Sequence, residues 1–502
     1  MHSDHNRSIA RGVGWMLLFK LAERSLGLLS TLILARLLAP TDFGVVAMAL
    51  SFIAMAQVFA GFGFDVALIR DQSASEDHYN TAWTLNAALG LAITLLMLAV
   101  ASPISTFYNR PELFWVVCAL AFGPLITGLE NIGVVAFRKE MTFRKEFAFQ
   151  LSRKLVGILV TVPLAYVLRS YWALVAGTLT SACLGTSISF LAHPFRPRFS
   201  LSKARGLLDF SRWLLVGSLV NFTRERSSDF FIGRLAGPAA LGAYNIAYEI
   251  SNLPTTELSA PINRALMPGF SRIADNPEAV QETYYRAFSL LALAAIPAAV
   301  GILATANFLV PVVLGERWLD AVPLVQMLAM AGIFQTMQSS SATALIATGH
   351  PKSVFTTNAL YALVLIIALS AFVPSRGANG AAISVLAAVL LATPVFVYFL
   401  RRYVGIRTRR IISHSWRPAC AAGVMAAAVF SFLPAYEAGT PTSRAVAYLA
   451  ASVLLGIAVY AVTLIGLWLA AGRPEGGERI LLSQIRTLVA RLTQSNLSRQ
   501  RE

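Results

Sequence analysis

The pattern of hydrophobic and polar positions divides the chain into long apolar segments separated by short polar ones. Each apolar segment has roughly the 20 residues that a helix needs to cross the hydrocarbon core of a bilayer. No segment shows the alternation that is typical of barrel strands. The pattern predicts an all-α, polytopic membrane protein with about fourteen spans, at residues 14–36, 43–64, 82–103, 112–136, 147–168, 171–192, 210–233, 239–262, 286–306, 319–346, 353–374, 380–400, 416–435 and 445–471.

One stretch of this pattern occurs twice. Trp15–Gly44 and Trp213–Gly242 align without a gap, and both end in the pattern RL-x-x-P-x-x-x-G. Proline is favoured in the first turn of a helix, and glycine lets two helix backbones approach closely. An even number of predicted spans separates the copies, so both cross the membrane in the same direction. The repeat predicts two six-helix lobes related by a parallel repeat, with two further helices at the C-terminal end.

These spans and the repeat predict the domain organisation. The predicted segments are an N-terminal six-helix lobe at 1–193, a cytoplasmic basic linker at 194–209, a C-terminal six-helix lobe at 210–401, two additional transmembrane helices at 402–471 and a cytoplasmic amphipathic basic tail at 472–502. Leucine and isoleucine recur at helical spacing within 478–492, which predicts a helix lying on the inner leaflet. A partner-binding tail is the alternative.

Composition and charge support a membrane protein. Only 13% of the 502 residues are charged and 56% are hydrophobic, whereas soluble proteins carry about 25% charged residues. The net charge of +16 indicates topology and contact with anionic lipid rather than nucleic acid, because the loops predicted on one side hold most of the Arg and Lys residues. This asymmetry predicts that both termini lie in the cytoplasm. The polar leader runs into a long apolar span with no small-residue cleavage site, which predicts that the first span is retained rather than cleaved as a signal.

No motif of an enzyme is present in the sequence. It lacks G-x-x-x-x-G-K-[ST], H-E-x-x-H and G-x-S-x-G, and it has no segment long enough for a soluble catalytic domain. The three cysteines lie far apart within predicted spans, which fits neither a zinc site nor a disulfide framework. We therefore expect a protein that is not an enzyme and that uses no metal and no cofactor.

Charged residues inside the predicted spans are the candidate site. An ionised side chain at mid-membrane costs about 2.5–3.5 kcal/mol on insertion scales, so these residues are expected to face a water-filled cavity or a partner of opposite charge. The candidates for binding substrate are the basic residues Lys20, Arg24, Arg224, Arg226, Arg153 and Lys154. The candidates for ion coupling or charge pairing are the carboxylates Glu23, Glu225, Asp229, Glu249 and Glu257.

The spacing of the basic residues limits how they can act. Arg224 and Arg226 differ by about 200° around a helix, so both cannot point straight into one cavity, and one is expected to pair with Glu225, Asp229 or the neighbouring lobe. Arg153 and Lys154 lie near the end of a span, where extension of their side chains to the membrane surface is an equal alternative. An excess of positive charge in a cavity between two lobes predicts a carrier for a bulky anion.

Several short motifs resemble those of polysaccharide exporters of the MOP superfamily. They are ARLLAPTDFG (35–44), FYNRPEL (107–113), AFRKEMTF (136–143), GRLAGPAALGAYNIAYEI (233–250) and MPGFSR (267–272). Their order and spacing are similar to those of the Wzx-like, colanic-acid-exporter type of lipid-linked oligosaccharide flippase, and the resemblance covers nearly the whole chain.

This resemblance implies a function in the bacterial inner membrane. The implied substrate is an undecaprenyl-pyrophosphate-linked oligosaccharide, moved from the cytoplasmic to the periplasmic leaflet for synthesis of an exopolysaccharide, capsule or O-antigen. Alternating access driven by an ion gradient is also implied. The implied partners are a polysaccharide polymerase and glycosyltransferases, and we expect no nucleic acid among the partners. Arg24 and Arg224 are then expected to engage the pyrophosphate across the cavity, supported by Lys20 and Arg226.

Two other functions fit parts of the pattern. A MATE-like multidrug or cation antiporter has a similar two-lobe fold, but export of cations would favour an acidic cavity. A scaffold for membrane glycosyltransferases would need no cavity, and the charges within the spans would then have no explanation.

Overall fold

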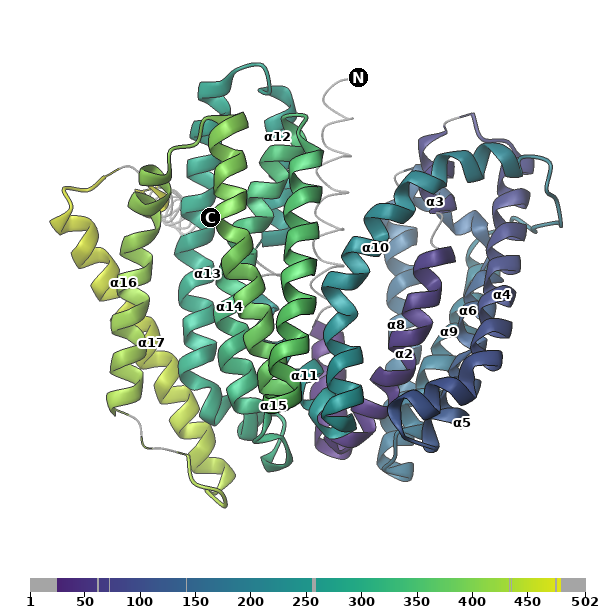
Figure 1. Ribbon diagram of the computed structural model, residues 1–502, viewed down its shortest axis with the longest axis horizontal. Helices are drawn as coiled ribbons and strands as arrows, with labels where there is room; N and C mark the ends of the chain where they lie inside the picture. Colours follow the sequence, from purple (N-terminus) through teal and green to yellow (C-terminus); the bar gives the residue numbers. More distant parts are fainter. Residues whose placement is uncertain are drawn as a thin grey trace, which may run out of the picture. The chain divides into compact units, whose positions relative to one another are not determined.

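Helices make up every regular element of the described structure. In the computed structural model (Figure 1), the described residues are 25–60, 63–71, 73–140, 142–254, 259–432, 434, 436–474 and 476–479. Within these ranges there are α-helices with short 3-10 and π segments and no strands, which confirms the all-α prediction.

The described helices are those of a multi-pass membrane protein. Seven are long and apolar enough to cross a membrane, or eight when the bent pair Glu112–Gly128 and Ile132–Lys139 is taken as one span. A shorter apolar helix, Ser25–Leu37, occupies the described part of the first predicted span. The helix at predicted span 210–233, α10 (Ala204–Leu235), is less apolar because it carries the charges between residues 224 and 229.

Packing divides the chain into two compact units, residues 1–243 and 244–502. The helix α11 (Gly237–Ser251) runs from the first unit into the second. The first unit extends past the predicted linker at 194–209 because α10 packs on helices that precede it in the chain. The two-lobe repeat and the predicted domain limits stay predictions.

The first unit is a bundle of long helices with one broken element. Within it α8 packs on α9, α4 packs on α5 and α6, and α10 packs on α2. Its elements are α2 (Pro40–Ala60), α3 (Phe64–Arg70), α4 (Glu76–Tyr108), α5 (Glu112–Leu120), α6 (Phe122–Gly128), η1 (Ile132–Val135), α7 (Ala136–Lys139), α8 (Phe143–Leu168), α9 (Trp172–Ala192) and α10.

The predicted span 112–136 is not one straight helix, because the chain turns by 65° between α6 and η1. Asn131 is fully buried at this break. Its backbone N–H donates to the hydroxyl of Ser189 (2.9 Å), its side-chain oxygen accepts from the N–H of Gly133 (2.9 Å), and its amide donates to two carbonyls at the start of the linker. The backbone groups freed by the break are thus satisfied.

The duplicated Pro and Gly positions contact one another. A Cβ atom on Gly44 would overlap the backbone carbonyl of Pro238, and a Cβ atom on Gly242 would overlap the backbone carbonyl of Pro40. Each proline lies in the first turn of its helix, α2 or α11, and each glycine follows one turn later. The glycine of each copy therefore accommodates the proline of the other, which is the close approach that the motif predicts.

The start of the linker is fastened along α4. The N–H of Arg198 donates to the side-chain oxygen of Asn80 (2.8 Å), and the N–H of Ser200 donates to the hydroxyl of Thr84 (3.0 Å). Phe199 packs its ring on Trp83, with the centroids 5.1 Å apart. Residues 194–203 therefore form an ordered strap that leads directly into α10.

The second unit is organised around its longest straight helix. This helix, α13, packs on α14, α16 and α17, and the two last helices pack on each other. The elements after α11 are α12 (Ala260–Arg272), α13 (Pro277–Val313), η3 (Glu316–Trp318), α14 (Ala321–Ala347), α15 (Pro351–Phe399), η4 (Leu400–Val404), α16 (Thr408–Phe432) and α17 (Thr442–Ala470). Within the predicted span 239–262, α11 ends at Ser251 and α12 begins at Ala260, and residues 255–258 lie outside the described part of the chain.

Two helices meet at a sharp turn within α15. Gly377 has a left-handed φ of 55° with ψ −134°, a conformation that favours glycine. Gly380 lies directly against the backbone carbonyl of Phe372, so the chain reverses there. The two arms correspond to the predicted spans 353–374 and 380–400.

Polar side chains of α14 bind neighbouring helices. The amide of Gln338 donates to the hydroxyl of Thr393 (2.9 Å), and the hydroxyl of Ser340 donates to the side-chain oxygen of Asn263 (3.2 Å). Ser341 forms a hydrogen bond with the hydroxyl of Tyr284 (3.1 Å). These polar residues of a predicted span thus serve helix packing. Most of the predicted tail helix, 478–492, lies outside the described residues.

Candidate functional site

A cavity of about 510 Å³ in the first unit brings together three of the predicted basic residues. We call it the basic cavity. Arg153 and Lys154 come from α8, and Arg226 comes from α10. Hydroxyl and amide groups line the same space; they belong to Ser30, Gln57, Thr127, Thr161, Thr178 and Ser181.

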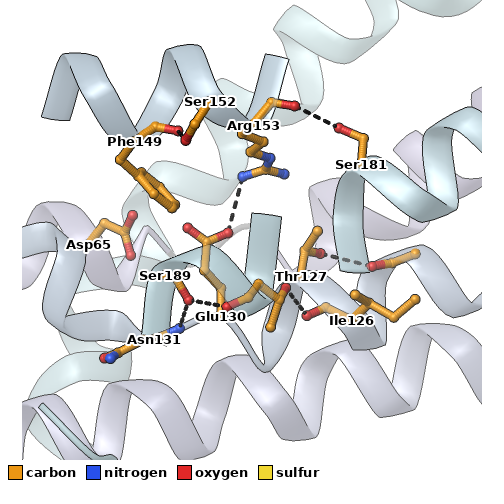
Figure 2. Close-up of polar contacts among 12 residues, drawn as sticks. Asp65, Ile126, Thr127, Glu130, Asn131, Phe149, Ser152, Arg153, Ser181 and Ser189 are labelled. Carbon is orange, nitrogen blue, oxygen red and sulfur yellow. Dashed lines mark hydrogen bonds and ion pairs between the residues drawn. The ribbon is translucent and has the colours of Figure 1, made fainter. Parts of the chain in front are cut away.

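Arg153 crosses α9 to reach a carboxylate at the broken span. Its Nη1 donates to Glu130 Oε2 at 3.1 Å, as Figure 2 shows. A Cβ atom on Gly185 would lie 3.0 Å from the Cδ and Nε atoms of Arg153. Glycine at this position of α9 therefore leaves room for the Arg153 side chain to pass. Glu130 directly precedes Asn131, and the break at that residue holds the carboxylate beside the guanidinium.

Arg153 and Thr127 also line a second, smaller cavity of about 240 Å³, which we call the polar chamber. Asp65 and Glu146 face this chamber, and Arg138 pairs with both of them, at 3.0 Å and 3.6 Å. The chamber is therefore lined by charges of both signs, with Arg153 at its boundary with the basic cavity.

Arg226 is paired within its own helix. Its Nη1 donates to Asp229 Oδ2 at 3.2 Å, one turn further along α10. The side chain of Asp229 is 3% exposed, and the hydroxyl of Ser51 on α2 lies 3.1 Å from the same oxygen. The carboxylate thus fixes α10 to α2 and holds Arg226 at the basic cavity.

The remaining predicted residues lie elsewhere. Arg224 and Glu225 are exposed on α10 and are not among the residues that line the basic cavity. Glu249 is half-buried on α11, in the second unit. Lys20, Glu23, Arg24 and Glu257 lie outside the described residues.

Sequence reasoning missed Glu130. It lies within the predicted span 112–136, yet it was not selected with the other carboxylates. A single acidic residue in the interior of an apolar span, followed by Asn131, was a usable signal, because such a residue needs a partner. The sequence did not indicate that this partner is Arg153.

Chemically, the basic cavity can hold an anion. A guanidinium presents planar donors that match phosphate oxygens, and an ammonium adds a point charge. Together with the hydroxyl groups, these side chains suit a solute that carries both phosphate and sugar. The fold around this cavity is that of a polytopic helical membrane protein.

Family comparison gives the class of protein to which this chain belongs. A family model described as polysaccharide biosynthesis protein matches residues 33–323, more than half of the chain. The chain therefore belongs to this family of polysaccharide biosynthesis proteins.

Curated relatives and a solved structure agree with this assignment. The chain is 25% identical to the lipopolysaccharide biosynthesis protein WzxC of Escherichia coli (strain K12), over 81% of this chain and 84% of that protein. It is 26% identical to the succinoglycan biosynthesis transport protein ExoT of Rhizobium meliloti (strain 1021), over 91% and 93%. The fold is similar to that of the lipid II flippase MurJ in an inward closed conformation, with a TM-score of 0.73, 14% identity, and coverage of 91% and 100%.

Proposed function

We propose that this protein flips an undecaprenyl-pyrophosphate-linked oligosaccharide from the cytoplasmic to the periplasmic leaflet of the bacterial inner membrane, for surface polysaccharide synthesis. One observation carries the proposal: Arg153, Lys154 and Arg226 line a single cavity whose other polar groups are hydroxyls and amides. The pyrophosphate meets the three basic side chains, and the hydroxyls and amides suit the sugar next to it. Both termini lie in the cytoplasm, and the protein transports without catalysing a reaction.

The carboxylates take part in loading and release. Arg153 is held by Glu130, and Arg226 is held by Asp229. A pyrophosphate that binds both guanidinium groups competes with both carboxylates, and the carboxylates regain their partners when the pyrophosphate leaves. This exchange offers a route by which an ion gradient drives alternating access, because a proton or a metal cation can neutralise a carboxylate that has lost its arginine.

The MATE-like alternative is less well supported. A site for organic cations would need carboxylates facing the substrate, whereas the residues described at the basic cavity include three basic side chains and no carboxylate.

Flipping can be tested in proteoliposomes loaded with a fluorescent undecaprenyl-pyrophosphate oligosaccharide. We expect Arg153→Gln/Arg226→Gln to lower the initial flipping rate at least about tenfold, because each charge-assisted contact contributes about 1.5–3 kcal/mol. Arg444→Gln, an exposed arginine in the first turn of α17, serves as the matched control and should flip at the parent rate.

A normal rate in the double variant, with the protein folded and inserted, would contradict this assignment. The same assay tests the predicted pair Arg24 and Arg224. Loss of flipping in Arg24→Ala/Arg224→Ala would mean that the pyrophosphate also binds this pair. Normal flipping by this variant would exclude Arg24 and Arg224 from the binding site. Genes for a polymerase and glycosyltransferases beside this one would support the pathway.

A further inference from the structure

We propose that the first unit holds a second anion site, separate from the basic cavity, which binds a phosphate group where the linker enters α10. A cavity of about 430 Å³ lies there, and we call it the linker pocket. Its charged and titratable lining residues come from the end of α3, the start of α4 and the start of α10; they are Arg70, Asp71, His78, Lys203 and Arg205. None of them lines the basic cavity or the polar chamber.

The strap fixes one wall of this pocket. The N–H of Lys203 donates to the hydroxyl of Thr81 on α4 (3.3 Å), which continues the contacts that Asn80 and Thr84 make with the strap. The backbone that carries Lys203 and leads to Arg205 is therefore held in place, which lowers the cost of ordering this segment when a ligand binds.

The opposite wall is fixed by the turn between α3 and α4. Arg70 lies in the last turn of α3. The ammonium of Lys139 donates to the backbone carbonyl of Asp71 (2.7 Å), and Arg138 pairs with Asp65 at the start of α3 (3.0 Å). These contacts hold α3 so that Arg70 faces the same space as Lys203 and Arg205.

The charge of the pocket is positive even with its one carboxylate counted. Asp71 accepts hydrogen bonds from the hydroxyl (2.6 Å) and the N–H (2.9 Å) of Ser73, which keep the pKa of this carboxyl below its usual range, so it stays ionised. Three basic residues and one acidic residue give a formal charge of +2 with His78 neutral. Nδ1 of His78 accepts from the N–H of Ser75 (3.2 Å), so the neutral ring carries its proton on Nε2 and can donate.

Phosphate is the chemical class that fits these donors. A tetrahedral phosphate can accept hydrogen bonds from two guanidinium groups and one ammonium at once, whereas a carboxylate offers only two oxygens. The volume lies within the roughly 300–1,000 Å³ of sites for small molecules, so the headgroup of an anionic phospholipid fits as well as free phosphate. A phosphate that joins Arg70 to Lys203 and Arg205 fastens the linker to α3 and stabilises the start of α10.

The binding experiment uses the full-length protein in neutral detergent, in the Arg153→Gln/Arg226→Gln background, which removes two of the three basic side chains of the basic cavity. The probes are dihexanoyl phosphatidylglycerol and inorganic phosphate, each titrated while the midpoint of thermal unfolding is followed. We expect the midpoint to rise with at least one probe. In Lys203→Gln/Arg205→Gln the dissociation constant should rise at least about tenfold, because two charge-assisted contacts are lost.

Two further variants separate charge from folding. Arg144→Gln/Arg198→Gln removes the same charge from exposed positions outside the pocket and should bind like the parent. Lys203→Arg/Arg205→Lys keeps the charge and should retain binding. Stabilisation by phosphatidylglycerol alone assigns a lipid headgroup, and stabilisation by inorganic phosphate assigns a free phosphate. No rise of the unfolding midpoint with either probe would overturn the site. Equal binding by the parent and by Lys203→Gln/Arg205→Gln would overturn it as well, and neither result would affect the proposed flipping function.

Discussion

The arginines of the basic cavity are each balanced by a carboxylate close by. Arg153 lies 3.1 Å from Glu130, and Arg226 lies 3.2 Å from Asp229. An isolated charge within a membrane span costs about 2.5–3.5 kcal/mol, and an ion pair with hydrogen bonds lowers this cost. The same pairs hold the arginines at the cavity, so an incoming phosphate must compete with them.

We expect Glu130→Gln to tighten binding of the pyrophosphate substrate and to slow its release. The amide removes the negative charge that competes for Arg153, and a hydrogen bond to a charged group contributes about 1.5–3 kcal/mol. In the proteoliposome assay the half-saturating substrate concentration should fall several-fold, and the maximal flipping rate should fall with it.

Glu146→Gln is the matched control for this substitution, because Glu146 faces the same polar chamber but pairs with Arg138. It should leave both kinetic values near those of the parent. Weaker substrate binding in Glu130→Gln would mean that this carboxylate positions Arg153 instead of competing for it.

At the level of single residues, the sequence identified charges but not their partners. Periodicity and the energy of burying a charge selected Arg153, Lys154, Arg226 and Asp229, and all four lie at or beside the basic cavity. The sequence could not show that Glu130 pairs with Arg153. The pair depends on the break at Asn131 and on the room that Gly185 leaves for the Arg153 side chain, and neither produces a periodic pattern in the sequence.

Among the elements, the duplicated motif gives a reciprocal contact. The glycine of each copy, Gly44 or Gly242, lies against the proline carbonyl of the other copy. The backbone N atom of Gly44 also lies 3.0 Å from the position of a Cβ on Gly242, so the two contacts form one close approach between helices. A methyl group at either glycine must push the helices apart.

We expect Gly44→Ala and Gly242→Ala each to destabilise the protein by about 1–3 kcal/mol, the usual range for overpacking. The double variant should lose less than the sum of the two, because one separation of the helices relieves both overlaps. Unfolding by denaturant in detergent micelles measures these values. Gly466→Ala, where a Cβ meets open space on α17, is the control and should be neutral or stabilising. Additive losses would show that the two contacts are independent.

The elements themselves were more predictable than their interruptions. Hydrophobic length located the helices now seen as α4, α8, α9 and α17, because each has a continuous apolar segment. It did not locate the interruptions in the predicted spans 112–136 and 239–262, although polar residues stand there, Glu130 and Asn131 in the first and Asn252 after the end of α11 in the second. Hydrogen bonds from Asn131 to distant residues stabilise the first break, and a local pattern does not reveal them.

At the scale of the whole chain, the start of the tail contacts two helices of the second unit, α13 and α16. The N–H of Gly477 donates to the hydroxyl of Ser289 on α13 (2.7 Å). Arg417 on α16 donates through Nε to Glu478 at 2.8 Å, and the two side chains are only 5% and 6% exposed. The other oxygen of Glu478 has no hydrogen-bond partner in the described part of the chain. The buried ion pair therefore joins α16 to the start of the tail, and the hydrogen bond of Gly477 joins the tail to α13.

This pair predicts a clear difference between single and double substitution. Arg417→Met leaves the carboxylate of Glu478 buried without its partner, and we expect a loss of about 3–5 kcal/mol in the free energy of unfolding. Arg417→Met/Glu478→Leu replaces the pair with apolar groups and should recover most of this loss, since such replacements are often neutral or stabilising by about 1–4 kcal/mol. The exposed pair Arg286 and Glu282, at 3.0 Å, gives the comparison: Arg286→Met should change stability by less than about 1 kcal/mol. A double variant as unstable as Arg417→Met would mean that hydrogen bonding and shape at this position, rather than an unpaired charge, hold the tail on α13 and α16.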